Sequence, residues 1–406
     1  MCKVMEVKIP LLHDSHNHAS LYAALAKCHD ISEKSPKDAL DFLYALPKDR
    51  LSVVKGWKSF ELELGHALLK ELPPLLAINF SLHGFVMSDS GLPFAAELVP
   101  ELHGKRHDLA WCEANVPAIF KAYASLSNIE EEDLVSYMDK MLCSGVASSD
   151  EMTVPSREFL ELCMNSRYRN RLNLWAAPSI FRELDKQEQD SLSGIKLYLD
   201  GAIGSSSAAI KGPWLTEGTV FFVYKDEELD VLVQEAAQYR TGVAIHAIGE
   251  LAIEQAIKSI EKANRLSGKL KRARIEHAQF ISLEQARKAR EQGIILSMQP
   301  NFTSDCIDYA DRLPLSCLMA NNPFRMLIDE AGFVPGQDLV FGSDGMPGDI
   351  AYAIRWSLFP PFASQYLSLD ELVAGYGMAI GCKGHSILKI DEKQKTVKLL
   401  HAKLDG

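Results

Sequence analysis

The stretch GVAIHAIGELAIEQAIKSIEKANRLSGKLKRARIEHAQ, residues 242–279, carries the clearest signal of a fold class. It starts and ends with two short runs that are predicted to form strands, the apolar GVAIHAIG and the more polar RARIEHAQ. Between these runs, Ile253, Ile257 and Ile260 recur at the spacing of one helix face. A strand, a helix and a second strand in this order predict parallel strands joined by a helical crossover.

The same alternation of apolar runs and helical patterns continues on both sides of this unit. Eight strands are predicted in all, over residues 7–16, 143–152, 171–178, 194–201, 242–249, 272–279, 293–300 and 338–345. Eight strands alternating with helices predict the α/β class and a (β/α)8 TIM barrel. A doubly wound open sheet is the alternative architecture.

One connection in this pattern is far too long for a single crossover. Residues 19–142 lie between the first and second predicted strands. We expect an insertion with its own helices. Because it follows the carboxyl end of the first strand, where barrel active sites form, we interpret it as a lid or substrate-pocket subdomain.

Composition narrows the classes of function. The net charge of −11 and a pI of about 5.6 argue against binding to nucleic acid or to an anionic membrane surface. No stretch approaches the ~18 apolar residues of a membrane span, and the opening MCKVMEVKIP lacks the apolar core of a signal peptide. The eight cysteines are scattered without a CxxC pair, which favours thiols in a reducing cytoplasm. We therefore expect a cytoplasmic protein without nucleic-acid or membrane partners.

Polar side chains with metal-binding chemistry stand within or at the ends of five predicted strands. They are His16, His18, Lys196, His246, His277 and Asp344. In a barrel all strand exits open onto one face, so these side chains are expected to share one pocket. Neutral imidazole and carboxylate are good ligands for zinc and similar divalent metals.

The spacing of the first two histidines has a geometric reason. Residues i and i+2 of a strand point the same way, so His16 and His18 can face one ion, whereas His13 has the opposite parity. Lys196 is the unusual member of the set, because metal ions repel an ammonium group. Two interpretations stay open for Lys196: a cation that faces substrate, or a carbamate formed with carbon dioxide that bridges two metals.

Together these segments resemble the amidohydrolase superfamily, and within it amidohydrolase family 3, the YtcJ-like metal-dependent hydrolases that include N-substituted formamide deformylase. The matching motifs are HDSHNHA (13–19), GVASSDEM (145–152), IKLYLDGAIGSSSAA (195–209), AIHAIGE (244–250), RIEHAQ (274–279), SMQPNF (297–302) and FGSD (341–344). They follow the family's order over roughly residues 10–350. KGW (55–57) and INFSLHGFVMS (78–88) are similar to the family's inserted region.

The resemblance implies a binuclear metal centre. His16, His18 and Asp344 would hold the more buried metal, His246 and His277 the second, and carbamylated Lys196 would bridge them. Zinc is the expected metal, although iron, manganese or cobalt also suits these ligands. His83, from SLHGF, is implied to face the substrate. The resemblance also implies a homodimer.

The chain departs from the family pattern in two places. The family's strands before H-x-H are mostly missing, which predicts a reduced or absent β-sandwich domain, and SILKIDEKQKTVKLL (386–400) is predicted to form two short strands. We therefore divide the chain into a hydrolase barrel, 1–385, and a short β remnant, 386–406. On the substrate side, Glu250 and the Ser206-Ser207 pair replace the family's usual aspartate and Arg-Thr pair.

The function predicted from these residues is hydrolysis of a C–N bond, of the amide type, in a small molecule. Asp344 would move the proton of the attacking water, and His83 would steady the oxyanion. Two alternatives stay open: a mononuclear deaminase or cyclic-amidine hydrolase on the same barrel, and a barrel that binds a metabolite without catalysis.

Overall fold

The computed structural model describes residues 4–58, 61–79, 85–106, 111, 115, 119, 129–216, 218, 220–267 and 270–405. The chain divides into two compact units, each described below by itself. The barrel unit comprises residues 1–20 and 130–406, and the inserted unit comprises residues 21–129. No described helix has the length and apolar character needed to span a membrane.

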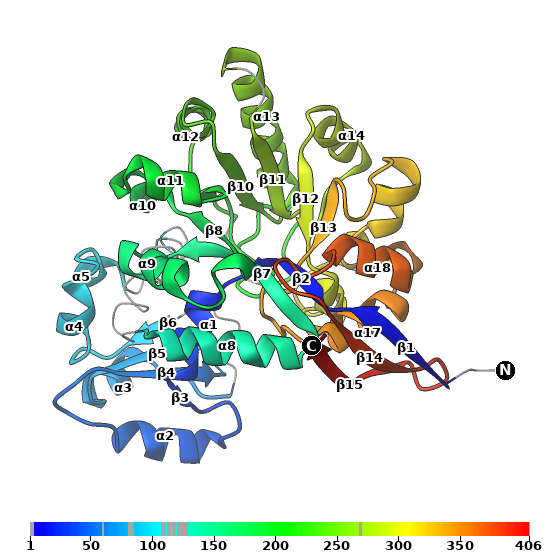
Figure 1. The fold of residues 1–406 in the computed structure, drawn as a ribbon. Helices are drawn as coiled ribbons and strands as arrows, with labels where there is room; N and C mark the ends of the chain where they lie inside the picture. Colours follow the sequence, from blue (N-terminus) through cyan, green and yellow to red (C-terminus); the bar gives the residue numbers. More distant parts are fainter. Residues whose placement is uncertain are drawn as a thin grey trace. The chain divides into compact units, whose positions relative to one another are not determined.

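The barrel unit is built on one eight-stranded sheet whose neighbouring strands all run parallel (Figure 1). The strands are β2 (Leu12–Asn17), β7 (Val146–Val154), β8 (Leu172–Ala176), β9 (Gly194–Tyr198), β10 (Gly242–Ala247), β11 (Arg272–His277), β12 (Ile295–Met298) and β13 (Leu339–Phe341). Their order in the sheet is their order in the chain. The last strand meets the first where the Asp344 N–H donates to the His16 carbonyl oxygen at 2.7 Å. The predicted (β/α)8 barrel is confirmed.

Helices follow the strands and lie outside the sheet (Figure 1). The α-helices are α8 (Glu131–Cys143), α9 (Arg157–Asn165), α10 (Pro178–Glu183), α11 (Lys186–Ser191), α12 (Asp226–Gln238), α13 (Glu250–Ser267), α14 (Leu283–Glu291), α15 (Asp305–Asp308), α16 (Leu315–Ala320), α17 (Ile350–Leu358) and α18 (Leu369–Tyr376). Short turns of other helix types are η1 (Arg169–Arg171), η2 (Pro300–Ser304), η3 (Met326–Glu330) and η4 (Ala363–Gln365).

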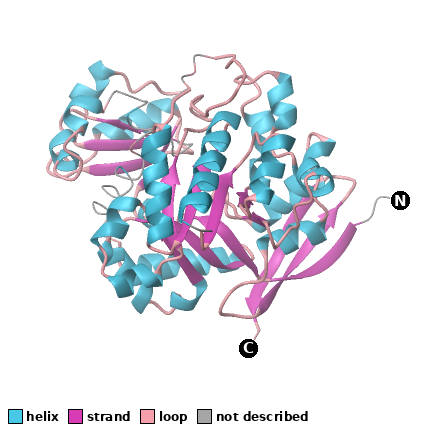
Figure 2. Cartoon of the chain, turned by 90° about the horizontal axis from the view of Figure 1, so that it is seen from above, coloured by secondary structure: helices cyan, strands magenta, loops and turns pink. Residues whose placement is uncertain are grey.

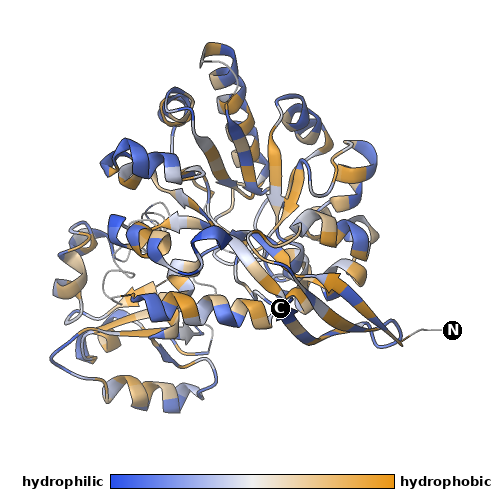
Figure 3. Cartoon of the chain, in the orientation of Figure 1, coloured by the Kyte–Doolittle hydropathy of each residue, from blue (hydrophilic) through white to orange (hydrophobic). Residues whose placement is uncertain are grey.

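Helix α13 shows why the sequence packs in this way. Ile253, Ile257 and Ile260 recur on one face and are buried, while Lys258 and Glu261 on other faces are exposed. Figure 3 shows the resulting mixture of apolar and polar colours along α13. Because each turn of the helix places an apolar side chain on the same side, burial of that face drives its packing onto the sheet.

The barrel unit also carries a small antiparallel sheet, in the order β1-β14-β15. It consists of β1 (Val4–Pro10), β14 (Gly384–Asp391) and β15 (Thr396–Leu404), and Figure 2 shows it beside the two chain ends. The tail thus contains two strands.

The single first strand predicted over residues 7–16 is wrong, because the chain breaks into β1 and β2. Pro10 ends β1, which fits its lack of an N–H donor for continued pairing.

The inserted unit has its own four-stranded sheet, in the order β3-β4-β5-β6. The strands are β3 (His29–Asp30), β4 (Ser52–Trp57), β5 (Leu75–Asn79) and β6 (Phe85–Met87); the described helices are α1 (Ala19–Ala26), which starts in the barrel unit, α2 (Pro36–Tyr44), α3 (His66–Glu71), α4 (Leu92–Ala96) and α5 (Leu102–Lys105). Strands β3, β4 and β5 pair in parallel, and β6 runs antiparallel to β5. The lid role expected for residues 19–142 stays a prediction.

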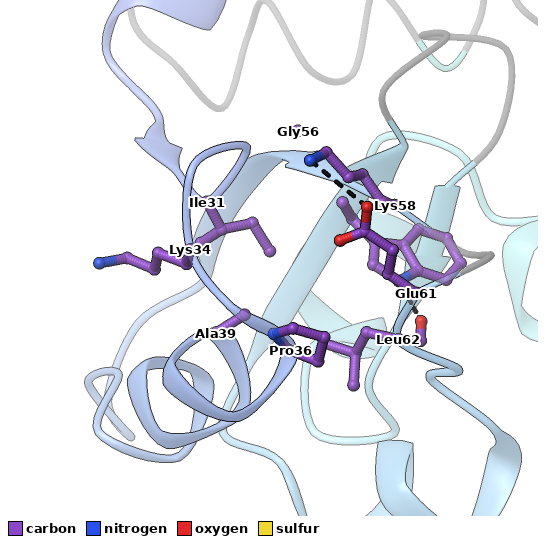
Figure 4. Close-up of a pocket in the computed structure, with 9 residues that line it drawn as sticks. Ile31, Lys34, Pro36, Ala39, Gly56, Lys58, Glu61 and Leu62 are labelled. Carbon is purple, nitrogen blue, oxygen red and sulfur yellow. Dashed lines mark hydrogen bonds and ion pairs between the residues drawn. The ribbon is translucent and has the colours of Figure 1, made fainter.

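Gly56 in the KGW motif lines a small hollow in the inserted unit (Figure 4). Its φ of +78° is a conformation that favours glycine, and a Cβ there would lie 2.8 Å from Ser32 Cβ. The next residue, Trp57, donates its indole N–H to the Leu62 carbonyl oxygen at 2.7 Å. The backbone conformation of Gly56 and the hydrogen bond of Trp57 therefore explain both residues of the motif by their structural roles within this unit.

Candidate metal centre

Three predicted ligands from opposite ends of the barrel sequence meet in one group. His16 and His18 come from the carboxyl end of β2, and Asp344 follows β13. One ligand atom of each lies within 4.8 Å of the other two. Asp344 Oδ1 is 3.2 Å from His18 Nε2 and 3.7 Å from His16 Nε2. The i, i+2 spacing therefore places both rings on the same side, as predicted.

The backbone around Asp344 is held in an uncommon conformation. Asp344 has φ of 56°, in the left-handed region. Asp14 on β2 accepts hydrogen bonds from the Ser343 N–H at 2.9 Å and from the Ser343 hydroxyl at 2.5 Å. These bonds, with the Asp344 N–H to His16 bond, fix the loop after β13 against β2. The surrounding structure thus determines where the Asp344 carboxylate points.

Two more predicted ligands join the group through ring contacts. The ring of His277 lies 4.7 Å from that of His16 and 4.5 Å from that of His246, measured between centroids. His277 has φ of 70°, which turns the chain at the end of β11. The four histidines come from β2, its carboxyl end, β10 and β11, and they form one continuous cluster.

Hydrogen bonds at one ring nitrogen of His16, His246 and His277 determine which nitrogen can bind a metal. Nδ1 of His16 lies 2.7 Å from a Glu276 carboxylate oxygen, and Nδ1 of His277 lies 2.7 Å from Gln299 Oε1. Nε2 of His246 lies 3.2 Å from the carbonyl oxygen of Gly201. These oxygens only accept, so each of these nitrogens carries the proton. The lone pair then lies on Nε2 of His16 and His277 and on Nδ1 of His246.

This pattern fits a divalent metal. Nε2 of His16 is buried and has no hydrogen-bond partner among the described residues, although it faces Asp344 at 3.7 Å. A ligating histidine typically donates its other N–H to a carboxylate or carbonyl group, as His16 does. An orphaned buried nitrogen would otherwise cost free energy, so the donor set is suited to a cation.

Lys196 lies inside the barrel on β9. Its side chain is 1% exposed, and its Nζ has no hydrogen-bond partner within the described part of the chain. Nζ stands 5.1 Å from the centre of the Tyr198 ring. Burial lowers the pKa of Lys196 to about 8, although the Glu276 and Asp344 carboxylates partly oppose this. An amine in this place is therefore closer to neutral than an ordinary lysine.

The charges around the cluster favour neutral imidazoles and an ionised carboxylate. Burial and then Lys196 hold the pKa of His16 well below its usual value, and burial and His16 do the same for His277. Burial raises the pKa of Asp344, but His16 and His18 outweigh it and bring the pKa to about 2. Both protonation states are those that metal ligands require.

A buried charged network beside the cluster is absent from the sequence-based prediction. The Arg274 guanidinium donates to Glu276 at 2.7 Å and to Asp150 at 2.5 Å. Burial raises the pKa of Glu276, but Arg274 and Lys196 outweigh it and the pKa is lowered. The signal for this network was present in RARIEHAQ, because Arg274 and Glu276 share one face of a predicted barrel strand.

Two further polar residues near the strand ends have structural partners. His13 has the opposite parity, as predicted, and lies 3.0 Å from an Asp150 oxygen. Asp200 accepts three backbone N–H groups, from Ala209, Ile248 and Gly249, so it holds loops after β9 and β10. His83 lies outside the described residues, and its substrate role stays a prediction.

Comparison with protein families gives one match over the barrel. The model of the amidohydrolase family matches residues 146–356, more than half of the chain. This range includes the predicted ligands from β9, β10, β11 and the loop after β13.

Two named relatives share sequence with the chain. YtcJ of Bacillus subtilis (strain 168), named as an amidohydrolase, is 25% identical over 350 residues, which cover 76% of this chain and 65% of YtcJ. Protein LONG AFTER FAR-RED 3 of Arabidopsis thaliana is 31% identical over 120 residues, or 29% of this chain and 21% of that protein. The chain therefore spans less than two thirds of either relative.

Two solved structures share the fold. An uncharacterized metal-dependent hydrolase from Pyrococcus horikoshii OT3 superimposes with a TM-score of 0.66 at 20% identity, over 91% of this chain and 80% of that one. A second, from Pyrococcus furiosus, has a TM-score of 0.66 at 21% identity, over 91% and 81%. At this identity the likeness shows the architecture.

Proposed function

Because the chain belongs to the amidohydrolase family, we propose that it is a metal-dependent hydrolase of a C–N bond, of the amide type, in a small molecule. The observation that carries the proposal is the convergence of His16, His18 and Asp344 within 4.8 Å beside the rings of His246 and His277. Three strands and two loops are needed to build this cluster, and the nitrogens of His16, His246 and His277 have the protonation pattern of ligands.

In this proposal the centre holds two divalent metals. His16, His18 and Asp344 would hold one, His246 and His277 would hold the other, and Lys196 as a carbamate would bridge them. Zinc is the proposed metal, and iron, manganese or cobalt suits the same ligands. The pKa of about 8 supports the carbamate, because roughly a tenth of such amines are neutral at pH 7 and only neutral amines attack carbon dioxide. The new N–C bond forms as the amine loses one proton.

The chemistry then divides between the metal and the side chains. Bound divalent metal supplies a Lewis acid that lowers the pKa of a water molecule and polarises the amide carbonyl. Asp344 accepts a proton from the attacking water and delivers it to the leaving nitrogen as the C–N bond breaks. The products are a carboxylic acid and an amine. His83 is proposed to donate a hydrogen bond to the developing oxyanion.

One observation favours a mononuclear variant of the same proposal. Among the described residues, the group with three ligand atoms within 4.8 Å is His16, His18 and Asp344. A deaminase or cyclic-amidine hydrolase would need only such a single metal, and Lys196 would then stay an ordinary amine. A homodimer stays a prediction.

The number of metal ions per chain distinguishes these hypotheses directly. The measurement is metal per chain by plasma mass spectrometry, on the wild type and on Lys196→Ala, followed by a panel of small amides. Two metals in the wild type and one or none in the variant support the bridged centre. One metal in both proteins favours the mononuclear variant. No metal after supplementation, or no turnover by the loaded protein, favours a barrel that only binds a metabolite.

A further inference from the structure

The small antiparallel sheet of the barrel unit ends on one side with β1. Strand β1 pairs with β14 along one edge, and no described strand of the barrel unit pairs with its other edge. Figure 1 shows β1, in blue, with β14 beside it. An edge strand presents a row of unpaired N–H and C=O groups, which can serve as a template for a further strand.

The backbone groups of β1 alternate between its two edges. The N–H of Leu11, directly after β1, donates to the Gly384 carbonyl oxygen at 3.1 Å, and these two residues continue the register of β1 with β14. In an antiparallel pair every second residue exchanges such bonds with its partner. The odd-numbered residues of β1 therefore bond to β14, whereas the even-numbered residues, among them Glu6 and Lys8, turn their N–H and C=O groups to the unpaired edge.

The side chains of β1 divide between the two faces of the small sheet. Glu6 and Lys8 are exposed, and neither has an ion-pair partner in the described part of the chain. Glu6 lies opposite Lys389 of β14 in the register of the sheet. The alternate side chains, from Met5 to Ile9, are half-buried or buried. The strand therefore presents one apolar and one charged face, as a strand within a larger sheet does.

The charges of β1 are complementary to those of a second copy of the same strand. If two β1 strands pair antiparallel through their unpaired edges, their even-numbered residues must exchange the hydrogen bonds. In the register that places Val7 opposite Val7, Glu6 of each chain lies opposite Lys8 of the other. A shift of two residues places either Glu6 opposite Glu6 or Lys8 opposite Lys8. Like charges directly opposite one another are destabilising, so one register is favoured.

The other outer strand of the same sheet has a different charge pattern. Strand β15 carries Lys398 and Lys403 and no acidic residue. Two copies of β15 would add only positive charges to a shared edge, and lysines are a common means by which proteins keep an edge unpaired. The sheet therefore has one outer strand whose charges oppose pairing with itself, and one, β1, whose charges favour it.

We propose that two copies of this chain associate by antiparallel pairing of their β1 edges, which joins the two three-stranded sheets into one continuous sheet. Glu6 then lies between Lys389 of its own chain and Lys8 of the second copy. Pro10 lacks an N–H and ends the pairing. An edge of seven residues makes a small interface, so the association is expected to depend on concentration. The inference does not depend on the proposed reaction.

The experiment is sedimentation velocity on the full chain over a series of concentrations. The wild type is expected to pass from a monomer of 45.1 kDa to a dimer as the concentration rises. Glu6→Lys and Lys8→Glu each place like charges opposite one another at two positions, so the dissociation constant of either variant should rise about tenfold or more. The double variant, Glu6→Lys with Lys8→Glu, restores opposite charges in the same register and should recover the affinity.

Two further variants separate strand pairing from a general effect of charge. Lys398→Glu changes the net charge by the same amount as Lys8→Glu, but on the exposed face of β15, and should leave the dissociation constant unchanged. Glu6→Pro removes an N–H that points to the unpaired edge and none that bonds to β14, so it should weaken the dimer. Circular dichroism shows that each variant is folded.

Several results would overturn the inference. These are a wild type that stays monomeric at every concentration, a dimer that both single charge reversals leave intact, a double variant that fails to recover, or an equal loss in Lys398→Glu. Zinc per chain should be the same in all of these variants. A failure of the dimer with normal metal content therefore leaves the proposed function standing.

Discussion

The interiors of the two units differ in chemistry. The barrel unit buries Lys196, Arg274 and Glu276 together with the histidine cluster. In the inserted unit, the described buried polar side chains are Ser52 and Ser88, and its two cores are mostly aliphatic. A buried charge costs several kcal/mol unless it is well paired. The barrel unit thus buries costly charges where the candidate site lies, whereas the described part of the inserted unit buries no charged side chain.

The largest expected effect comes from the carboxylate proposed to move the proton. Asp344→Asn keeps the size of the side chain and removes its basicity, so turnover should fall about 10²–10⁴-fold. The measurement is kcat/KM on whichever amide the panel identifies. Asp311→Asn, a carboxylate that is 75% exposed, is the control and should retain activity. Full activity in Asp344→Asn would contradict the assigned role.

Arg274→Met should show how strongly the barrel interior depends on charge pairing. It leaves the buried carboxylates of Glu276 and Asp150 without their cation, which typically costs about 3–5 kcal/mol. Urea unfolding measures this change in free energy. Arg290→Met removes a half-exposed pair with Asp338 and should cost less than about 1 kcal/mol. Similar values for the two variants would remove the contrast between the interiors.

Leu43→Ala tests the opposite case, a purely apolar core position in the inserted unit. Leu43 is fully buried, so truncation should cost about 2–5 kcal/mol by the lost contacts and the cavity left behind. Zinc per folded chain should be unchanged, because no predicted ligand lies among the neighbours in this core. Loss of metal from folded Leu43→Ala would show that the two interiors are coupled.

The smallest expected effect is a pH dependence at Asp150. Burial raises the pKa of Asp150, but His13 and Arg274 outweigh it and the pKa lies below the ordinary 3.8. For a lowered pKa, the stabilisation is present above about pH 4 and is lost as the pH falls toward the folded-state pKa. The difference in unfolding free energy between wild type and Asp150→Asn should therefore shrink from pH 7 to pH 3. A constant difference would mean that Asp150 acts only through its shape.

The first strand and the strand that carries His277 show how much of the barrel can be predicted from the sequence. Seven of the eight barrel strands overlap the runs that predicted them, because burial of both faces leaves a local compositional signal. The boundary of the first strand was wrong, because pairing of β1 with β14 depends on residues more than 370 positions away. His16 and His18 share a face as their spacing predicted. His277 does not follow simple alternation, since its φ of 70° is imposed by the turn after β11.

The sequence by itself determined the strand–helix rhythm and the polar residues at the strand exits, and hence the predicted ligand set, because periodicity and residue type are local properties. Only the tertiary structure decided which nitrogen carries the proton in three of these histidine rings. That choice depends on the acceptor beside that nitrogen: Glu276 for His16, 260 positions away, Gln299 for His277, 22 away, and Gly201 for His246, 45 away. A proton's position on an imidazole follows from what lies beside it in space, and closure of the barrel brings those partners together.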